Sequence, residues 1–211
     1  KDCIRGEYYR VKNLLDKSPS RLELFTYMDD DVYQLAMQHS KENPFNFYLD
    51  YKKNLNELSE EEKEFLQGEG YKFVCLIETT KMSKVYKMPV LMAFYNHGDI
   101  RMEVTEQQLL ASWKEFFSTG TNWKDLDKDM TYEKYMAISD KEHINKILKM
   151  PVNYLQLSGD GFFVKRDGCA LALSEKLQGV IDNPVFVDQM RDVIRYRTMD
   201  YYQRRYRNVD M

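Results

Sequence analysis

One proline inside an apolar run constrains the middle of this chain. Residues 83–104 read SKVYKMPVLMAFYNHGDIRMEV, with Pro89 among apolar neighbours. Proline removes a ladder hydrogen bond from a central strand but is tolerated near the start of a helix. We therefore expect a helix that begins near Lys87 and ends at Gly98, followed by a short strand over residues 100–104.

Helix signals dominate the residues on both sides of this run. Ser59 and Glu62 form a capping box before a helix that stops at Gly68. Thr105 caps a further helix after the expected strand. We therefore expect residues 1–68 to be helical.

Residues 71–80 fit either a strand or the buried stripe of a helix, because hydrophobic periodicity alone does not decide between them. Interpreted as a helix, residues 71–80 precede a helix, a short strand and another helix. That order has the outline of a winged helix-turn-helix unit.

A second unit with this outline is predicted downstream. A helix pattern after Asp140 meets a break near Pro151, and residues 162–164 can pair with residues 169–173 across a Lys-Arg-Asp-Gly turn. Asp-Gly is a strong hairpin signal.

The fold class predicted from these patterns is α+β and predominantly helical. We expect a helical segment at 1–68, a winged-helix-like unit at 69–120, a linker at 121–140, and a second such unit with a C-terminal helix at 141–211. Both units contain the tetrapeptide KMPV, which makes an internal duplication one interpretation.

Composition favours a globular, soluble, cytoplasmic protein. The chain has 211 residues, of which 43% are hydrophobic, with 9 Gly and 5 Pro. It contains no apolar stretch of the roughly 20 residues that span a membrane, and no apolar signal core near its start. Three widely spaced cysteines favour reduced thiols over disulfides or zinc ligands. Because the chain starts without Met, we expect it to be a piece of a longer polypeptide.

The sequence predicts no catalytic, cofactor or metal site, so we do not expect this segment to be an enzyme. The glycines at 68–70 lack the Lys-Ser/Thr of a phosphate-binding loop, and the three histidines stand singly. A metal-dependent nuclease is a lesser hypothesis, which would draw on Asp160 with Glu175, or on Glu78 with Lys81.

Basic residues cluster locally although the formal net charge is -3. Residues 191–207 hold six arginines against Asp192 and Asp200, and tyrosines lie among them. Such a segment can contact phosphates and stack on bases, or it can be an amphipathic helix with its aromatic residues packed inward. The predicted nucleic-acid-binding residues are Lys165, Arg166, Arg195, Arg204, Arg205 and Arg207.

Three segments resemble the C-terminal region of bacterial DEAD/DEAH-type superfamily 2 helicases, including type III restriction res-subunit-like proteins. They are SRLELFTYMDDDVY, KMSKVYKMPVLMAFYNHGDIRMEV and RTMDYYQRRY. Pro19-Ser20-Arg21 corresponds to a Pro-Ser/Thr-Arg segment that follows the motor domains of such proteins, and residues 86–98 to a Tyr-Lys-x-Pro-Val-Leu segment with a glycine turn. The resemblance implies a DNA context and upstream helicase motor domains in the same polypeptide.

Two functions follow as hypotheses from the charges and the resemblance. The leading one is a non-catalytic accessory region of a helicase or restriction-type protein that contacts DNA. The second is a protein-interaction module that docks on the motor domains or on a partner subunit, favoured if Tyr27, Met28 and Tyr33 are exposed.

Overall fold

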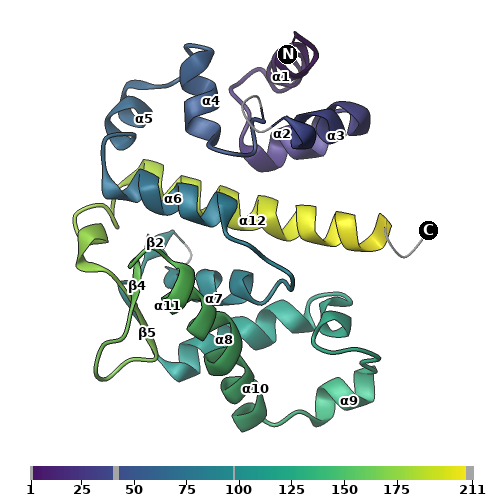
Figure 1. The fold of residues 1–211 in the computed structure, drawn as a ribbon, viewed down its shortest axis with the longest axis vertical. Helices are drawn as coiled ribbons and strands as arrows, with labels where there is room; N and C mark the ends of the chain where they lie inside the picture. The colour runs from purple at the N-terminus through teal and green to yellow at the C-terminus, as the bar shows by residue number, and fades with distance from the viewer. Residues whose placement is uncertain (1, 40–42, 97, 208–211) are drawn as a thin grey trace. The chain divides into compact units, whose positions relative to one another are not determined.

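The structure is a computed structural model that describes residues 2–39, 43–96 and 98–207 (Figure 1). The chain forms two compact units. Unit 1 comprises Lys1–Thr79 with Pro184–Met211, and unit 2 comprises Thr80–Asn183. Helices predominate and the strands are short and antiparallel, so the predicted α+β class is confirmed.

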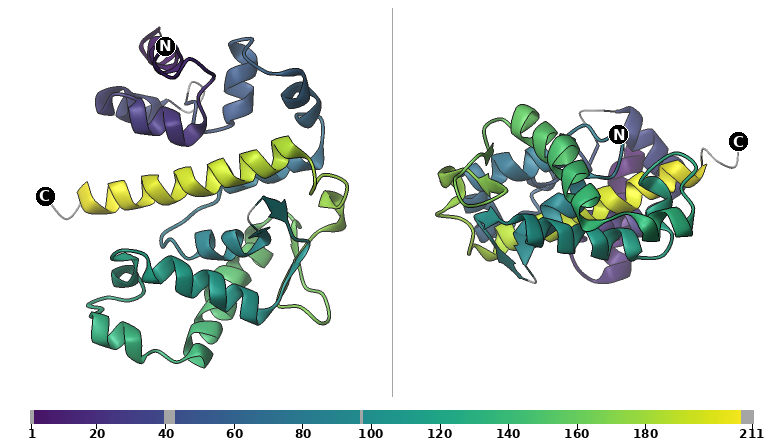
Figure 2. Two further views of the ribbon diagram at one scale, coloured as in Figure 1. Left: turned by 180° about the vertical axis from the view of Figure 1, so that it is seen from behind. Right: turned by 90° about the horizontal axis from the view of Figure 1, so that it is seen from below.

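Unit 1 is helical throughout its regular structure. Its elements are α1 (Asp2–Leu15), α2 (Arg21–Tyr27), α3 (Asp30–Gln38), α4 (Tyr48–Asn54), α5 (Glu60–Phe65), α6 (Glu69–Thr79) and α12 (Pro184–Arg207). Helices α6 and α12 run side by side (Figures 1 and 2). The Phe186 ring of α12 lies 6.0 Å from the Phe65 ring and 5.9 Å from the Phe73 ring, measured between centroids. The sequence fitted either a strand or a helix at residues 71–80. In the structure all but the last of these residues belong to α6, and Phe73 lies in its buried stripe.

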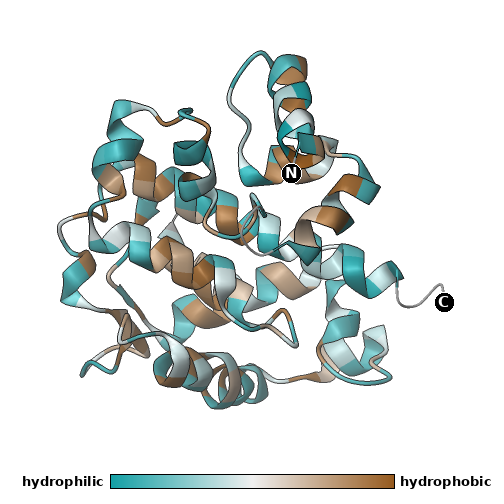
Figure 3. Cartoon of the chain, turned by 45° about the horizontal axis from the view of Figure 1, so that its top comes forward, coloured by the Kyte–Doolittle hydropathy of each residue, from teal (hydrophilic) through white to brown (hydrophobic). Residues whose placement is uncertain are grey.

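Capping boxes start two of these helices, and that of α5 lies where the sequence predicts it. Ser20 with Glu23 and Ser59 with Glu62 each form a reciprocal capping box, at the starts of α2 and α5. Figure 3 shows hydrophobic and hydrophilic residues alternating along the helices, the pattern expected of helices with one buried side.

A buried guanidinium lies at the centre of unit 1. The side chain of Arg21 is fully buried, and its Nε–H donates to Glu78 Oε1 at 2.6 Å. Its Nη1 donates to Gln189 Oε1 at 2.6 Å and to Asp192 Oδ2 at 3.0 Å. Burial alone would lower the pKa of Arg21, but the carboxylates of Glu78 and Asp192 raise it above its ordinary value. The guanidinium therefore stays charged inside the protein.

The two carboxylates that hold Arg21 also complete the starts of two helices. Glu78 accepts hydrogen bonds from the backbone N–H groups of Phe47 at 2.8 Å and Tyr48 at 3.2 Å, where α4 begins without a side-chain cap of its own. Asp192 accepts from the N–H groups of Arg21 at 2.9 Å and Leu22 at 3.1 Å, in the first turn of α2. This network therefore joins α2, α4, α6 and α12.

Unit 2 combines helices with short strands. Its helices are α7 (Lys87–Phe94), α8 (Glu106–Ser118), η1 (Asn122–Asp125), α9 (Tyr132–Ala137), α10 (Asp140–Ile147), η2 (Leu148–Val152), α11 (Asn153–Ser158) and η3 (Glu175–Leu177). Its strands are β1 (Tyr95–Asn96), β2 (Asp99–Ile100), β3 (Glu103–Val104), β4 (Phe163–Val164) and β5 (Leu171–Leu173).

The predicted hairpin is confirmed, and it belongs to a sheet with the order β3-β5-β4. Phe163 pairs with Leu173, and Val164 with Ala172. The other edge of β5 pairs with β3, the strand expected to belong to the first winged-helix-like unit. Because strands from both predicted units share one sheet, two separate winged-helix-like units are not confirmed.

Two local predictions need correction. Helix α7 ends at Phe94 rather than at Gly98, because the chain reverses in the β1–β2 hairpin, where Gly98 has a φ of +116°. The predicted break at Pro151 is instead a π-helical turn, η2, which continues from α10 into α11. A wide turn accommodates a proline, which has no N–H to donate.

The two units have different bounds from the segments predicted from the sequence. Helix α12 was expected to belong with residues 141–183, but it packs on α2, α5 and α6. Residues 121–140, predicted to form a linker, contain η1 and α9. Trp123 of η1 stacks on Tyr135 of α9, with 6.4 Å between ring centroids.

Replacing Arg21 with Ala should strongly destabilise unit 1, because Glu78 would remain buried without its partner. The expected loss in the free energy of unfolding is about 3–5 kcal/mol, measured by urea denaturation followed by circular dichroism. Arg191→Ala is the control, since Arg191 forms an exposed ion pair with Asp188 and its loss should change stability by less than about 1 kcal/mol. Equal effects of the two substitutions would contradict a structural role for the buried network.

Gly159→Ala should destabilise unit 2. A Cβ at Gly159 would lie 2.3 Å from the Leu155 carbonyl oxygen and 2.6 Å from Phe163 Cδ2, so α11 and β4 would have to separate. We expect a loss of about 1–3 kcal/mol, measured by tryptophan fluorescence, since Trp113 and Trp123 both lie in unit 2. Gly179→Ala is the matched control, because no heavy atom lies within 4 Å of its added Cβ. Unchanged stability in Gly159→Ala would show that this contact is not tight.

Candidate nucleic-acid interface

A groove of about 440 Å³ in unit 2 is lined by the basic hairpin and by the helix around Pro151. The hairpin supplies Lys165 and Arg166, and the first turns of α11 supply Asn153 and Gln156. The remaining lining residues are Leu148, Val152, Asp167, Cys169 and Ala170.

The sheet fixes the hairpin side of this groove. Strand β5 is wholly buried and is hydrogen-bonded on both edges, to β4 and to β3. Gly168 has a φ of +85° in the connecting loop, a left-handed conformation that glycine adopts without a steric penalty. The ring of Phe163 lies 6.2 Å from that of Phe94 in the interior of the unit. Lys165 and Arg166 thus follow directly from an anchored strand.

Helix α11 positions two further lining residues of the groove. Asn153 and Gln156 are three residues apart, so their side chains are neighbours on one side of α11. Leu155, between them in sequence, is 1% exposed and anchors the helix in the core.

The two hairpin cations differ in their partners. Arg166 Nη1 lies 2.5 Å from Glu103 Oε1, and Arg166 Nη2 lies 3.8 Å from Glu175 Oε1. The hydrogen bond to Glu103 raises the pKa of Arg166, so the guanidinium is cationic at any working pH. Because Glu103 and Glu175 are exposed to solvent, their ion pairs with Arg166 contribute little free energy, and a phosphate can replace them.

Three side chains of the groove, those of Lys165, Asn153 and Gln156, differ from Arg166 in their partners. Within the described part of the chain, none of these three side chains has a hydrogen-bond or ion-pair partner. Cys169 differs, because its Sγ–H donates to the Arg166 carbonyl at 3.4 Å and burial raises the pKa of its thiol. The groove therefore offers one ammonium and two amides to a ligand.

The predicted arginines of α12 are not gathered on one surface. Arg195 and Arg204 are nine residues apart, which is two and a half helical turns, so they lie on opposite sides of the helix. Arg204 Nη2 is 2.8 Å from Asp200 Oδ2, and Arg207 Nη2 is 2.7 Å from Asp30 Oδ2. Arg205 is half-buried. Carboxylates of unit 1 thus already neutralise two of these four arginines.

Arg195 lines a larger cleft of about 700 Å³ within unit 1. Most of the charged side chains in that cleft are already paired with one another. The pairs are Lys17 with Glu23, Lys52 with Glu62, and Arg191 with Asp188, at 2.6, 2.6 and 3.1 Å. This larger cleft therefore has less capacity for a charged ligand than its size implies.

Among the residues that the structure describes, no three His, Cys, Asp or Glu side chains come close enough to hold a metal ion. Glu78, one candidate for a metal-dependent nuclease, is buried against Arg21. The three cysteines are free thiols. His97 lies outside the described residues. In the same part of the chain, no helix is both long enough and apolar enough to cross a membrane.

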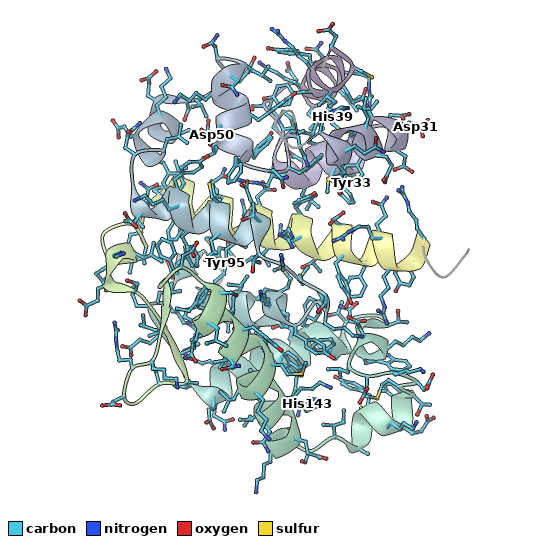
Figure 4. The ribbon with its side chains drawn as sticks, in the orientation of Figure 1. Asp31, Tyr33, His39, Asp50, Tyr95 and His143 are labelled. Carbon is cyan, nitrogen blue, oxygen red and sulfur yellow. The ribbon has the colours of Figure 1, made fainter. Side chains whose placement is uncertain are left out.

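The surface proposed for docking around Tyr27 needs correction. Tyr27 is exposed, but Met28 and Tyr33 are buried. Tyr33 (labelled in Figure 4) packs in an aromatic cluster with Phe45 and donates its hydroxyl hydrogen to Asp200 Oδ1 at 2.5 Å. These two side chains stabilise unit 1 and are not available to a partner.

Sequence reasoning missed Asn153 and Gln156. A signal for them is present in the sequence: two amide residues stand three positions apart just after Pro151, on either side of the apolar Leu155, which is the spacing of neighbours on one side of a helix. Their proximity to Lys165 and Arg166 depends on how the hairpin folds back on α11, which local patterns do not encode.

Comparison with protein-family models, with curated protein sequences and with solved structures finds no match to this chain.

A buried histidine fixes the helix that leads into the groove. Helix α10 continues through η2 into α11, and its His143 (Figure 4) accepts a hydrogen bond at Nδ1 from Trp113 Nε1–H of α8 at 3.1 Å. Burial lowers the pKa of His143 below its ordinary value of 6.5; Lys114 and Lys146 lower it further, and Asp140 and Glu142 oppose them.

The stability of unit 2 should therefore fall with decreasing pH. Below pH 6.5 the unfolded chain binds a proton at His143 that the folded chain resists, so the free energy of unfolding decreases. Tryptophan-monitored urea denaturation between about pH 7.5 and pH 5.5 measures this decrease. His143→Asn keeps an acceptor for Trp113 but does not titrate, so its stability should depend less on pH. Parallel pH profiles for the two proteins would contradict this role of His143.

Proposed function

We propose that this chain is a non-catalytic accessory region of a helicase or restriction-type protein, and that it contacts DNA through the groove of unit 2. The observation that carries the proposal is that Lys165, Asn153 and Gln156 have no partner among the described residues, in a groove that Arg166 also lines. The helicase context rests on the sequence resemblance.

The charges in the groove suit a phosphate backbone. Lys165 and Arg166 are adjacent in sequence on an anchored hairpin and both line the groove, and ionic hydrogen bonds to phosphate are stronger than those between neutral groups. Asp167 also lines the groove and limits how many phosphates it accepts. Unit 2 has fourteen Lys and Arg against fourteen Asp and Glu, so attraction to DNA is local rather than spread over its surface. We therefore expect modest affinity with few phosphate contacts.

A second candidate function is docking onto a protein, such as the motor domains or a partner subunit. Met150, Tyr154 and Leu157 are 37%, 55% and 75% exposed, and their spacing places them along one side of η2 and α11. Exposed aromatic, Met and Leu side chains in a row favour a protein contact. Substitutions in the groove that leave Met150, Tyr154 and Leu157 intact separate the two candidates. Loss of DNA binding in such a variant favours the DNA-binding function over protein docking.

Lys165→Ala/Arg166→Ala should weaken DNA binding about tenfold at low salt, because two solvent-exposed ionic contacts to phosphate are lost, each worth at most about 1 kcal/mol. The slope of log affinity against log salt should also become shallower by about one per lost contact. Fluorescence anisotropy with labelled single-stranded and duplex DNA measures both quantities. Lys141→Ala, an exposed lysine outside the groove lining, should leave binding unchanged.

Substitution of the arginines of α12 tests whether DNA binds there instead of in the groove. Because Arg204 and Arg207 are ion-paired within unit 1, the triple substitution of Arg204, Arg205 and Arg207 by Ala should weaken binding less than the double substitution in the groove. A larger effect of the triple substitution would move the DNA contact to α12 and overturn the proposal.

A further inference from the structure

The two cations of the groove differ in what a ligand must displace to reach them. Lys165 is exposed and has no ion-pair or hydrogen-bond partner among the described residues. Arg166 donates from Nη1 to Glu103 Oε1 at 2.5 Å, and its Nη2 lies 3.8 Å from Glu175 Oε1. An anion can therefore bind Lys165 directly, whereas at Arg166 it competes with carboxylates that the chain itself supplies.

The sheet holds Glu103 within reach of Arg166. Glu103 in β3 and Val164 in β4 are both paired with Ala172 of the central strand β5. Arg166 lies two residues beyond Val164, so the two charged residues stand on opposite sides of β5. Neighbouring strands are about 4.8 Å apart, and an arginine and a glutamate together can bridge two such spacings. Because the three strands are hydrogen-bonded together, rotation of the side chains is the simplest way to separate this pair.

Glu103 is the strongest competitor among the carboxylates near the two cations. Its side chain accepts a hydrogen bond from the guanidinium, whereas the side chain of Glu175 is 90% exposed and approaches only to 3.8 Å. Asp167 lines the groove but forms no ion pair within the described part of the chain. Neither Glu103 nor Glu175 is among the residues that line the groove. The guanidinium of Arg166 is therefore engaged by groups outside the groove.

We infer that Glu103 makes an autoinhibitory contact: it holds Arg166 in the free protein, and a DNA phosphate must displace it to reach the second cation of the groove. This inference rests on the proposed function and adds its regulation. Lys165 provides the first phosphate contact, and Arg166 provides the second only when Glu103 releases it. Because an ion pair between exposed groups contributes little free energy, Glu103 lowers the affinity for DNA without abolishing binding.

Glu103→Gln should bind DNA more tightly than the wild-type chain. Gln keeps the shape of the side chain but not its charge, and a neutral hydrogen bond holds a guanidinium less strongly than an ionic one. Glu103 is exposed on the edge strand β3, so the substitution should leave the fold intact. We expect about twofold to fivefold tighter binding at low salt, the range that an exposed ion pair supplies. Fluorescence anisotropy with labelled single-stranded and duplex DNA measures the change.

Two further variants separate competition for Arg166 from a general effect of charge. Glu106→Gln removes the same charge three residues along the chain, where the exposed Glu106 has no ion pair among the described residues, and should change binding by less than about twofold. In Arg166→Ala, Glu103 has no guanidinium to hold. Arg166→Ala and Arg166→Ala/Glu103→Gln should therefore bind DNA with equal affinity.

The outcomes distinguish this inference from the proposed function. Unchanged DNA binding in Glu103→Gln would overturn the autoinhibitory contact while the DNA site stands. So would an equal gain in Glu106→Gln, or a gain from Glu103→Gln that persists without Arg166. No binding of any DNA at low salt, by the wild-type chain and by Glu103→Gln, would overturn the proposed function and this inference together.

Discussion

The buried guanidinium of Arg21 is the interaction on which unit 1 depends. Its ion pairs with Glu78 and Asp192 connect α2, α6 and α12, and the same carboxylates hold backbone N–H groups at the starts of α2 and α4. A buried charge is costly unless its hydrogen bonds are satisfied. The network joins the helices of unit 1, and removal of one member would leave its partners buried without their hydrogen bonds.

The charges of the two units are used differently. In unit 1, cations such as Lys52, Arg204 and Arg207 are paired with carboxylates of the same unit. In the groove of unit 2, Lys165 is unpaired within the described residues, and Arg166 holds exposed carboxylates that a phosphate can displace. The two units thus differ in how many of their basic side chains are held by carboxylates of the same unit.

Local signals predicted much of the fold, while the candidate site depends on tertiary contacts. Capping boxes, the Asp167-Gly168 turn and the position of Pro89 specify helices and a hairpin through interactions a few residues long. The pairing of β3 with β5 and the packing of α12 on α6 join residues far apart in sequence, so the predicted units had different bounds. For the same reason Lys165 and Arg166 were predicted from their position at the turn of the expected hairpin, whereas Asn153 and Gln156 were not.

The most direct test of the account is to titrate the 15N-labelled chain with single-stranded DNA and follow its backbone and side-chain amide resonances. The account predicts that the side-chain NH₂ signals of Asn153 and Gln156 shift together with backbone signals of residues 164–170, while those of residues 195–207 stay in place. Shifts confined to α12, or none at saturating DNA, would contradict a DNA site in the groove of unit 2.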